Sequence, residues 1–222
     1  QQQHLDKLQA IAEYEPIAEE QVFVPNKQTV IVNCFAGPGA GKTTCAWEIA
    51  SELKKRGIEA EYVSEYAKEL VWDNNTKLLD GSLQSQKELY DIQNHRVKRL
   101  LGKVDVVVTD SPAVMGLMYL KEENTEFEAK AISDFKSQHN FNLFINRGDS
   151  FQQAGRIHNL KESKAIDTLI QQLLENNNIY YGTYEHSTID KVVKNIQTHL
   201  EKVNDNSFSN EQDNTLTNEH TQ

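Results

Sequence analysis

Residues 29–50 read TVIVNCFAGPGAGKTTCAWEIA, and this stretch decides the fold of the chain. Its apolar, β-branched beginning predicts a buried strand, and the helical spacing of Trp47, Ile49 and Leu53 predicts a helix after it. The small residues between them match the pattern GxxxxGK[ST] from its second glycine onward, with Ala36 where the first glycine is usual. A strand, a glycine-rich loop and a helix in this order indicate a loop that binds phosphate groups.

The chemistry of phosphate binding explains the composition of this loop. Backbone N–H groups must approach a phosphate closely, and glycines leave them the room and the dihedral freedom to do so. The following helix adds its unpaired N-terminal N–H groups and their partial positive charge. We expect Lys42 to reach the β- and γ-phosphates of ATP and the Thr43 hydroxyl to ligate Mg²⁺. The predicted nucleotide-binding residues are Gly37, Pro38, Gly39, Ala40, Gly41, Lys42, Thr43 and Thr44.

Length and composition fit one α/β domain with short additions. The chain has 222 residues, of which 38% are hydrophobic, enough for one sizeable core. Its formal net charge of -10 disfavours a broad nucleic-acid surface, because such binding draws on many contacts from Lys and Arg to phosphates. The sequence has no long apolar run and no export signal, so we expect neither a membrane nor secretion. Cys34 and Cys45 flank the loop, and we expect them to be buried thiols in a reducing cytoplasm.

The rest of the chain alternates predicted strands and helices, as an α/β fold requires. We expect a domain over residues 29–203, an N-terminal extension over residues 1–28 and a disordered acidic tail over residues 204–222. The tail contains four acids and neither Lys nor Arg. Further strands are predicted at 58–63, 104–110, 141–147 and 179–184, and helices from Ser64 and at 83–101, 112–120, 125–138, 163–176 and 189–203.

The strand predicted at 104–110 ends in an acidic residue, Asp110. Its continuous apolar run is typical of a buried parallel strand, and parallel strands bring their carboxyl ends to the same edge of a sheet. If this strand lies beside the one that opens the loop, Asp110 reaches the loop and helps to hold Mg²⁺, directly or through water. Asp105 begins the same strand and therefore lies on the wrong edge for this role.

Four more charged residues are candidates for substrate and lid functions. Glu65 follows the second predicted strand and is a candidate to orient or deprotonate a substrate hydroxyl; an acid that complements the helix dipole is the alternative. Arg96 is a candidate to hold a substrate phosphate or hydroxyl bidentately, although charges on long helices are usually solvated. Arg156, with Arg147 as a second candidate, lies in a segment that we expect to close over the nucleotide. Glu69 is expected to form a surface salt bridge.

Short motifs follow the loop in a recognisable order. The chain reads, in sequence, GPGAGKTT, SEYAKELV, QNHRVKRL, VVTDSP, FINRGDSFQQAGR and IYYGTYE. This order, over residues 30–203, resembles the kinase-like P-loop proteins grouped with the nicotinamide riboside kinase domain of the bacterial NAD-biosynthesis regulator. The resemblance implies the P-loop NTPase fold, a three-layer α/β sandwich whose five-stranded parallel sheet is ordered 2-3-1-4-5. It also implies ATP, Mg²⁺ and a small phosphoryl acceptor.

The resemblance assigns roles to residues by their position in these motifs. The implied roles are phosphate and metal binding for Lys42 and Thr43, metal or acceptor hydroxyl for Asp110, acceptor binding for Glu65 and Arg96, and the lid for Arg156. Two departures concern the acceptor: the sequence contains no adenylyltransferase domain, and the strand end reads TDSP where the family has a more acidic version. The identity of the acceptor is therefore left open.

These features predict an ATP- and Mg²⁺-dependent kinase that transfers the γ-phosphoryl group to a nucleoside, nucleotide or riboside. The alternative is a nucleotide-binding ATPase or regulator that switches a protein partner, and the acidic tail is the feature that favours it. A nucleic-acid end kinase is a third class, and the net charge weighs against it.

Overall fold

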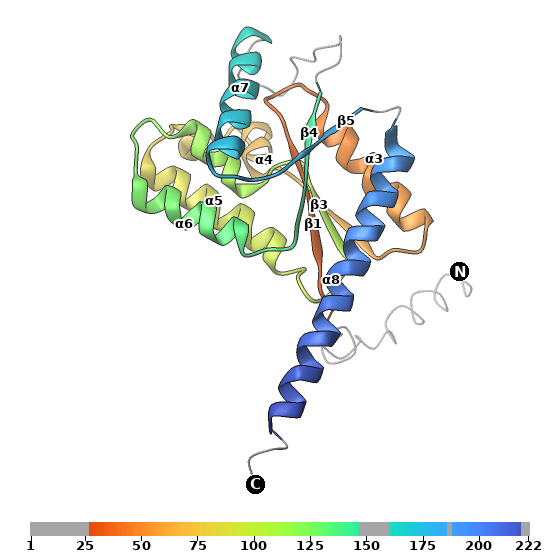
Figure 1. The fold of residues 1–222 in the computed structure, drawn as a ribbon. Coiled ribbons are helices and arrows are strands. Elements are labelled where there is room, and N and C mark those ends of the chain that lie inside the picture. The colour runs from red at the N-terminus through yellow and green to blue at the C-terminus, as the bar shows by residue number, and fades with distance from the viewer. Residues whose placement is uncertain (1–26, 147–159, 186–187, 219–222) are drawn as a thin grey trace, which may run out of the picture.

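In the computed structural model, five parallel strands form one sheet in the order β2-β3-β1-β4-β5 (Figure 1). β1 (Val30–Phe35) lies in the middle, between β3 (Val106–Thr109) and β4 (Asn140–Ile145). β2 (Ala60–Val63) and β5 (Gly182–Tyr184) form the edges. All six residues of β1 are buried, as expected for a parallel strand covered on both faces. The predicted fold and strand order are confirmed.

The structure describes residues 27–146, 160–185 and 188–218, with side chains of the last helix described to residue 205. Most of the predicted N-terminal extension lies outside these ranges. The helices are α3 (Lys42–Lys55), α4 (Tyr66–Trp72), α5 (Leu83–Lys98), α6 (Thr125–Lys136), α7 (Leu160–Asn176) and α8 (Ile189–Asn218), with two short 3-10 helices, η1 (Lys77–Leu79) and η2 (Ala113–Tyr119).

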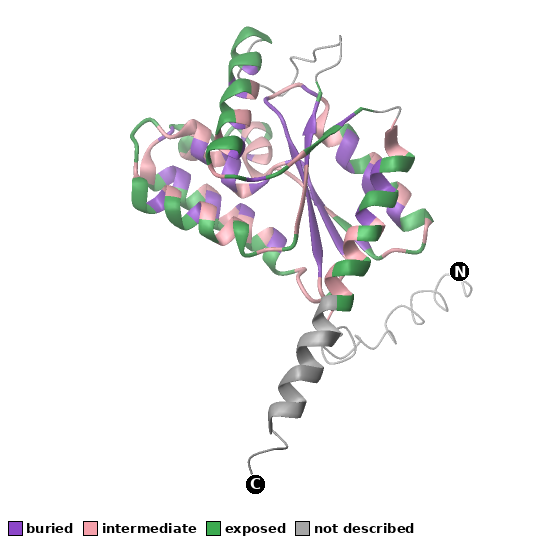
Figure 2. Ribbon diagram, viewed as in Figure 1, coloured by how far each residue is buried: buried purple, intermediate pink, exposed green. Residues whose placement is uncertain are grey.

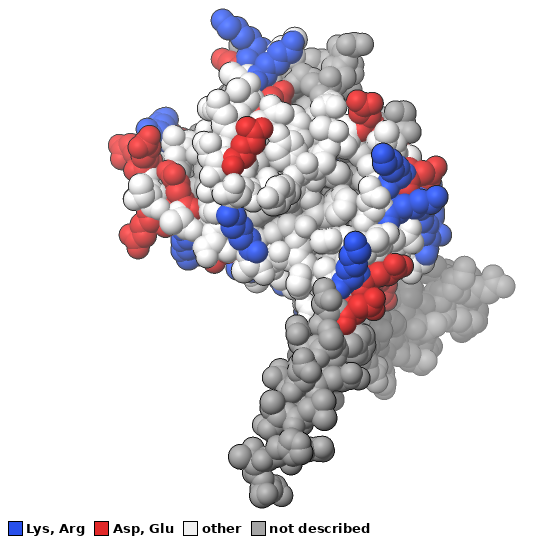
Figure 3. Space-filling view, in the orientation of Figure 1, with Lys and Arg blue, Asp and Glu red and all other residues white. Residues whose placement is uncertain are grey.

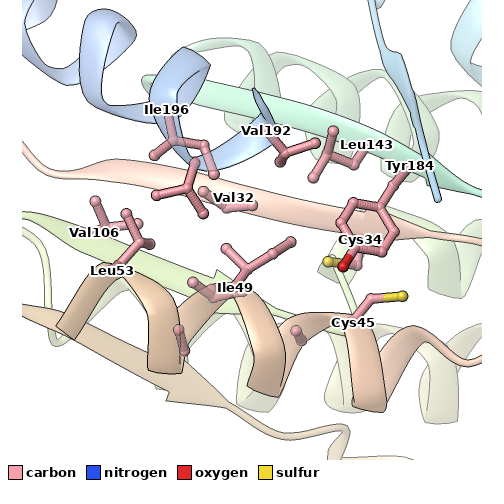
Figure 4. Packing of buried hydrophobic residues seen from close by; sticks show 14 of the residues in the cluster. Val32, Cys34, Cys45, Ile49, Leu53, Val106, Leu143, Tyr184, Val192 and Ile196 are labelled. Atoms are coloured by element: carbon pink, nitrogen blue, oxygen red, sulfur yellow. The ribbon is translucent and has the colours of Figure 1, made fainter. Parts of the chain in front are cut away.

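Helices cover both faces of the sheet, so the fold has three layers (Figure 1). α3 and α8 lie on one face, where Leu53 and Ile196 pack against Val32 of β1 (Figure 4). α5, α6, α7 and η2 cover the other face and pack around Phe35. Because neighbouring strand residues point to opposite faces, the run of apolar residues in β1 supplies both cores. Figure 2 shows the central strands β1 and β3 buried and the outer sides of the helices exposed.

Both cysteines are buried free thiols, as the sequence predicts. Cys34 lies in β1 and Cys45 in α3, and both belong to the core between the sheet and α3, close to the ring of Tyr184 (Figure 4). Burial raises the pKa of both thiols, that of Cys45 to about 12. Neither thiol is therefore suited to nucleophilic chemistry near neutral pH.

Two element boundaries near the second strand differ from the prediction. β2 begins at Ala60 because Ile58 still belongs to the end of α3: its N–H bonds to the Leu53 carbonyl (3.1 Å), after a glycine with positive φ. Glu65, and not Ser64, is the N-cap residue of α4. The Ser64 hydroxyl donates to Glu69 Oε1 (2.8 Å) instead. It is thus engaged by a side chain further along the helix.

The segment after the third strand is also shorter and tighter than predicted. It forms the 3-10 helix η2, in which Met115 N–H bonds to the Pro112 carbonyl (2.9 Å), and not an α-helix over residues 112–120. A segment of this length with Gly116 in its middle gains too few α-helical hydrogen bonds to offset the cost of nucleation.

The last helix runs further than the sequence predicts. α8 continues to Asn218, whereas the helix was expected to end at residue 203 and residues 204–222 to be disordered. Asn204 belongs to the folded domain, because its Oδ1 accepts a hydrogen bond from Gln28 N–H (3.3 Å). The disorder predicted for residues 204–222 stays a prediction, whereas α8 does not end at residue 203 as predicted.

Figure 3 shows one face of the molecule, with charged side chains mostly at its rim and uncharged residues in its centre. Basic and acidic side chains are interspersed along the described part of that rim, which differs from the basic stripe of a typical nucleic-acid surface. Among the described residues, no helix combines the length and the apolar character that crossing a membrane requires.

Candidate active site

The loop between β1 and α3 has the backbone conformation of a phosphate cradle. Gly39 and Gly41 have φ angles of 75° and 92°, which residues with a side chain rarely adopt. Gly41 is the N-cap of α3 and makes no side-chain capping hydrogen bond, and a helix N-terminus of this kind suits a phosphate group. Ala36 is fully buried and is not among the residues with positive φ, so a methyl group in place of the usual glycine fits without strain.

Lys42 and a residue of α7 hold this loop from two sides. Lys42 Nζ donates to the Gly37 carbonyl (3.1 Å), which folds the lysine side chain over the cradle. The Gly37 N–H donates to Asp167 Oδ1 of α7 (2.5 Å). We did not predict a role for Asp167 from the sequence, because no motif near it indicates a contact with a loop 130 residues away.

Asp110 lies beside the loop, as the prediction of a shared metal site requires. Its Oδ2 accepts hydrogen bonds from Thr43 Oγ1 (2.5 Å) and from the Tyr62 hydroxyl (2.9 Å). Asp110 comes directly after β3, which is the strand next to β1, and the residue is only 1% exposed. The other oxygen, Oδ1, is buried and has no hydrogen-bond partner among the described residues. A buried carboxylate oxygen without a partner, next to a threonine hydroxyl, fits a hard cation or one of its water ligands.

Tyr62 is a second residue that sequence reasoning missed. Burial raises the pKa of its hydroxyl, and the negative charge of Asp110 raises it further, so the tyrosine remains a hydrogen-bond donor to that carboxylate. The exposed ring of Trp47 packs edge-on against Tyr62, with 6.1 Å between ring centroids. The only available signal was the position of Tyr62 at the end of β2, next to β3 in the sheet.

A cavity of about 1060 Å³ opens at the carboxyl edge of the sheet, where ligands of open α/β folds bind. The loop lines its middle. At one end it is lined by Asn146 and Glu185, which follow β4 and β5. At the other end it is lined by residues of α4, α5, η1 and η2, which follow β2 and β3. Its volume lies at the upper limit for one drug-sized ligand, so a nucleotide leaves room for a second small molecule.

Glu65 lines the second end of this cavity, as its predicted role requires. It sits at the N-cap of α4, so its backbone position is set by the turn from β2 into that helix. Burial raises the pKa of the Tyr119 hydroxyl, and the charges of Glu65 and Asp167 raise it further. The two carboxylates therefore lie within electrostatic reach of the same tyrosine.

Arg96 is not brought to the cavity. Its Nη1 donates to Glu69 Oε1 (2.8 Å) and its Nη2 to Glu69 Oε2 (2.6 Å), and its guanidinium stacks over the Tyr66 ring at 4.8 Å. The hydrogen bonds from Arg96 lower the pKa of Glu69. The predicted salt bridge of Glu69 is thus present, and Arg96 ties α5 to α4. Arg147 and Arg156, the lid candidates, lie outside the described residues.

Comparison with known proteins identifies the family of this chain. The family described as AAA domain matches residues 33–188. No match was found among curated proteins. Two similar solved structures are the Mycobacterium tuberculosis APS kinase CysC in complex with AMPPNP and APS (17% identity, TM-score 0.42, covering 80% of this chain and 99% of that one) and Chaetomium thermophilum Kti12 in complex with ADP-AlF3 (12% identity, TM-score 0.43, covering 77% and 98%). Similarity this remote carries no information about a substrate.

Proposed function

The chain belongs to the AAA domain family, and from the site that it forms we propose that it is an ATP- and Mg²⁺-dependent kinase. In this proposal it transfers the γ-phosphoryl group of ATP to a hydroxyl group of a nucleoside, nucleotide or riboside. The observation that carries the proposal is the extent of the cavity, which continues past the phosphate loop into a second end lined by side chains. An enzyme that only hydrolyses ATP has no need of such an end.

The position of Asp110 indicates which end would take which substrate. Asp110 follows β3, on the side of the loop where Glu65 also lies, and Thr43 donates to it. If these two residues hold the metal, the γ-phosphate faces the β3 side of the loop. The nucleoside part of ATP then extends toward Asn146 and Glu185, and the acceptor occupies the end between α4 and η2.

Each residue has a defined task in this scheme. Lys42 would neutralise charge on the β- and γ-phosphates, and the N–H groups of the loop would hold their oxygens. Thr43 and Asp110 would hold Mg²⁺, which supplies charge neutralisation to the phosphates when bound. Glu65 would orient the acceptor hydroxyl and accept its proton. Arg156 remains a prediction for the charge that closes over the transferring group.

An ATPase that switches a protein partner is the second candidate, and α8 favours it. This helix extends well beyond the sandwich formed by the other elements (Figure 1). A helix that leaves the domain offers a surface for a protein partner. The nucleotide-binding residues keep the same tasks in this alternative, but Glu65 would then have no acceptor to orient.

The test is a product assay with the full chain, ATP, Mg²⁺ and a panel of nucleosides, nucleotides and ribosides. We expect at least one acceptor to raise ATP consumption in equal measure with a phosphorylated product, detected by mass spectrometry. Slow hydrolysis without an acceptor is the second expected result, since a kinase must protect the transferring group from water. Hydrolysis that no acceptor changes, and that a protein bound to α8 stimulates, would replace the kinase with the switch.

A further inference from the structure

Gln86 on α5 is a buried amide whose side chain has no hydrogen-bond partner among the described residues. It is 4% exposed and lines the cavity, and no hydrogen bond joins its side chain to another described residue. Gln93, two helical turns further along α5 and also buried, is different. Its Oε1 accepts from Tyr66 N–H (2.9 Å) and its Nε2 donates to the Ser64 carbonyl (3.1 Å). One glutamine of this helix thus supports α4, and the other presents its amide to the cavity.

Buried polar side chains are nearly always hydrogen-bonded, so an exception calls for a ligand or another physical reason. The Gln86 amide atoms are not among the fully enclosed side-chain atoms that lack partners, and the residue lines the cavity. A molecule in the cavity can therefore supply the missing partners. A carboxamide offers one acceptor oxygen and two donor hydrogens in one plane, and it pairs best with an edge that offers both.

The walls beside Gln86 suit a flat ring. Tyr90 and Met115 are buried and line the same end of the cavity, together with Leu79 and Leu89. A Cβ atom at Gly116 would lie 3.3 Å from Gln86 Oε1, closer than such contacts usually are, so the glycine leaves the amide its place. Apolar and aromatic walls around one polar group are the usual construction of a site that fixes the orientation of a ring.

We infer that Gln86 is a specificity-determining residue that hydrogen-bonds the amide-type edge of a planar ring in the phosphoryl acceptor. The inference rests on the proposed kinase function and narrows its substrate class. The acceptor is a nucleoside or nucleotide whose ring carries an adjacent donor and acceptor, as in a nucleobase or a ring carboxamide. Glutamine makes such bidentate pairs with the adenine edge in nucleic-acid recognition, which shows that the geometry is favourable.

The test compares acceptors and variants in one phosphorylation assay with ATP and Mg²⁺. The acceptors are uridine, thymidine, adenosine, inosine, their monophosphates, nicotinamide riboside and a phenyl riboside that lacks the polar edge. The variants are Gln86→Leu, Gln86→Glu and, as a matched control, Gln84→Leu, which changes an exposed glutamine of the same helix. Melting temperature and binding of a non-hydrolysable ATP analogue check that each variant is folded.

We expect Gln86→Leu to lower kcat/KM for the accepted nucleoside by about 10- to 100-fold, with the KM for ATP unchanged. The phenyl riboside should react poorly with the parent and no worse with the variant. Gln86→Glu, which keeps the shape but loses both donor hydrogens, should shift preference toward ring edges that offer two donors. Gln84→Leu should behave as the parent.

Three results would overturn the inference, and they separate it from the proposed function. If nucleosides are phosphorylated equally well by the parent and by Gln86→Leu, the kinase stands and Gln86 does not read the ring. If only the KM for ATP rises in the variant, Gln86 contacts the adenine of ATP and the orientation of the substrates is reversed. If no acceptor yields a phosphorylated product while the ATP analogue still binds, the proposed function and the inference both fail.

Discussion

The two ends of the cavity are built from different parts of the chain. Around the loop, the groups offered to a ligand are mainly backbone N–H groups, fixed by a turn that Gly39 and Gly41 make possible. At the acceptor end they are side chains such as Glu65 and Gln86, carried by separate elements. A backbone cradle depends on a short contiguous sequence, whereas a side-chain pocket depends on how distant elements pack. In the proposed kinase, the first would hold the nucleoside triphosphate and the second would decide what receives the phosphoryl group.

The largest loss of activity should come from removing the positive charge of Lys42, which lies over the loop. Lys42→Ala removes the ammonium that lies over the loop, and we expect turnover to fall by ~100-fold or more, with weaker ATP binding. Lys54→Ala is the matched control, because it removes a half-exposed lysine from the same helix. Steady-state ATP consumption and calorimetric titration measure both quantities. A Lys42→Ala protein that binds and consumes ATP normally would contradict the proposal that the loop is the nucleotide-binding end of the cavity.

A smaller effect is expected from the metal site at the junction of the two ends. Asp110→Asn keeps the shape but removes the negative charge, so turnover should need a higher Mg²⁺ concentration and should recover partly when Mg²⁺ is raised. Asp105→Asn is the control, because Asp105 directly precedes the first residue of β3, at the opposite edge of the sheet from Asp110. This change should leave the Mg²⁺ dependence unchanged. Titrations of activity against Mg²⁺ give the comparison. Equal curves for Asp110→Asn and the parent would remove Asp110 from the metal site.

At the acceptor end, Glu65→Gln should separate the two ends kinetically. We expect acceptor-dependent turnover to fall by about 10² to 10⁴-fold, the range for loss of a general base, with ATP affinity unchanged. Glu61→Gln, an exposed acid of β2, is the control. The measurement is kcat and KM for both substrates. If ATP affinity falls together with turnover, Glu65 belongs to the nucleotide end.

The smallest effect concerns the ion pair that supports the acceptor end from behind. Hydrogen bonds from Arg96 lower the pKa of Glu69 from its ordinary value of 4.5, so this pair stabilises the fold above that pH, and the contribution is lost as the pH falls through the lowered pKa. Because the carboxylate is 44% exposed, we expect less than about 1 kcal/mol. Glu69→Gln should therefore lower the free energy of unfolding slightly at about pH 7 and by less at about pH 3. Urea titrations at the two pH values measure the difference, and an equal loss at both would exclude an electrostatic cause.

The sheet and the loop could be predicted from the sequence because their signals are local. The apolar run of β1, the glycines of the loop and the acid at the end of β3 each lie within a few residues. The strand order came from the resemblance to a family. The exact ends of β2 and α4 could not be predicted, since they depend on where the Ser64 hydroxyl and the Ile58 N–H find partners.

The hydrogen-bond partners of side chains at the acceptor end also could not be predicted from the sequence, because they depend on how distant elements pack. Arg96 was expected to contact a substrate, which stays a prediction; its pairing with Glu69 depends on the packing of α4 on α5 and could not be predicted from the sequence. Tyr62 and Asp167 contact the site from β2 and α7 without any motif of their own. The end of α8 at Asn218, beyond the predicted residue 203, could not be predicted either, because a formed helix adds residues at a lower cost than a new helix needs to start.

Cys34 and Cys45 can report when the core between the sheet and α3 opens, because both thiols are buried in it. Both thiols are fully enclosed between the sheet and α3, and their raised pKa leaves little thiolate to react. An alkylating reagent can therefore modify them only when this core opens, so the rate of labelling measures the free energy of that opening. Because Cys45 lies in the first turn of the helix that begins at the loop, a nucleotide bound to the loop slows its labelling by as much as it stabilises the closed core. The rate at which these two thiols are labelled therefore measures ligand binding without an assay of catalysis.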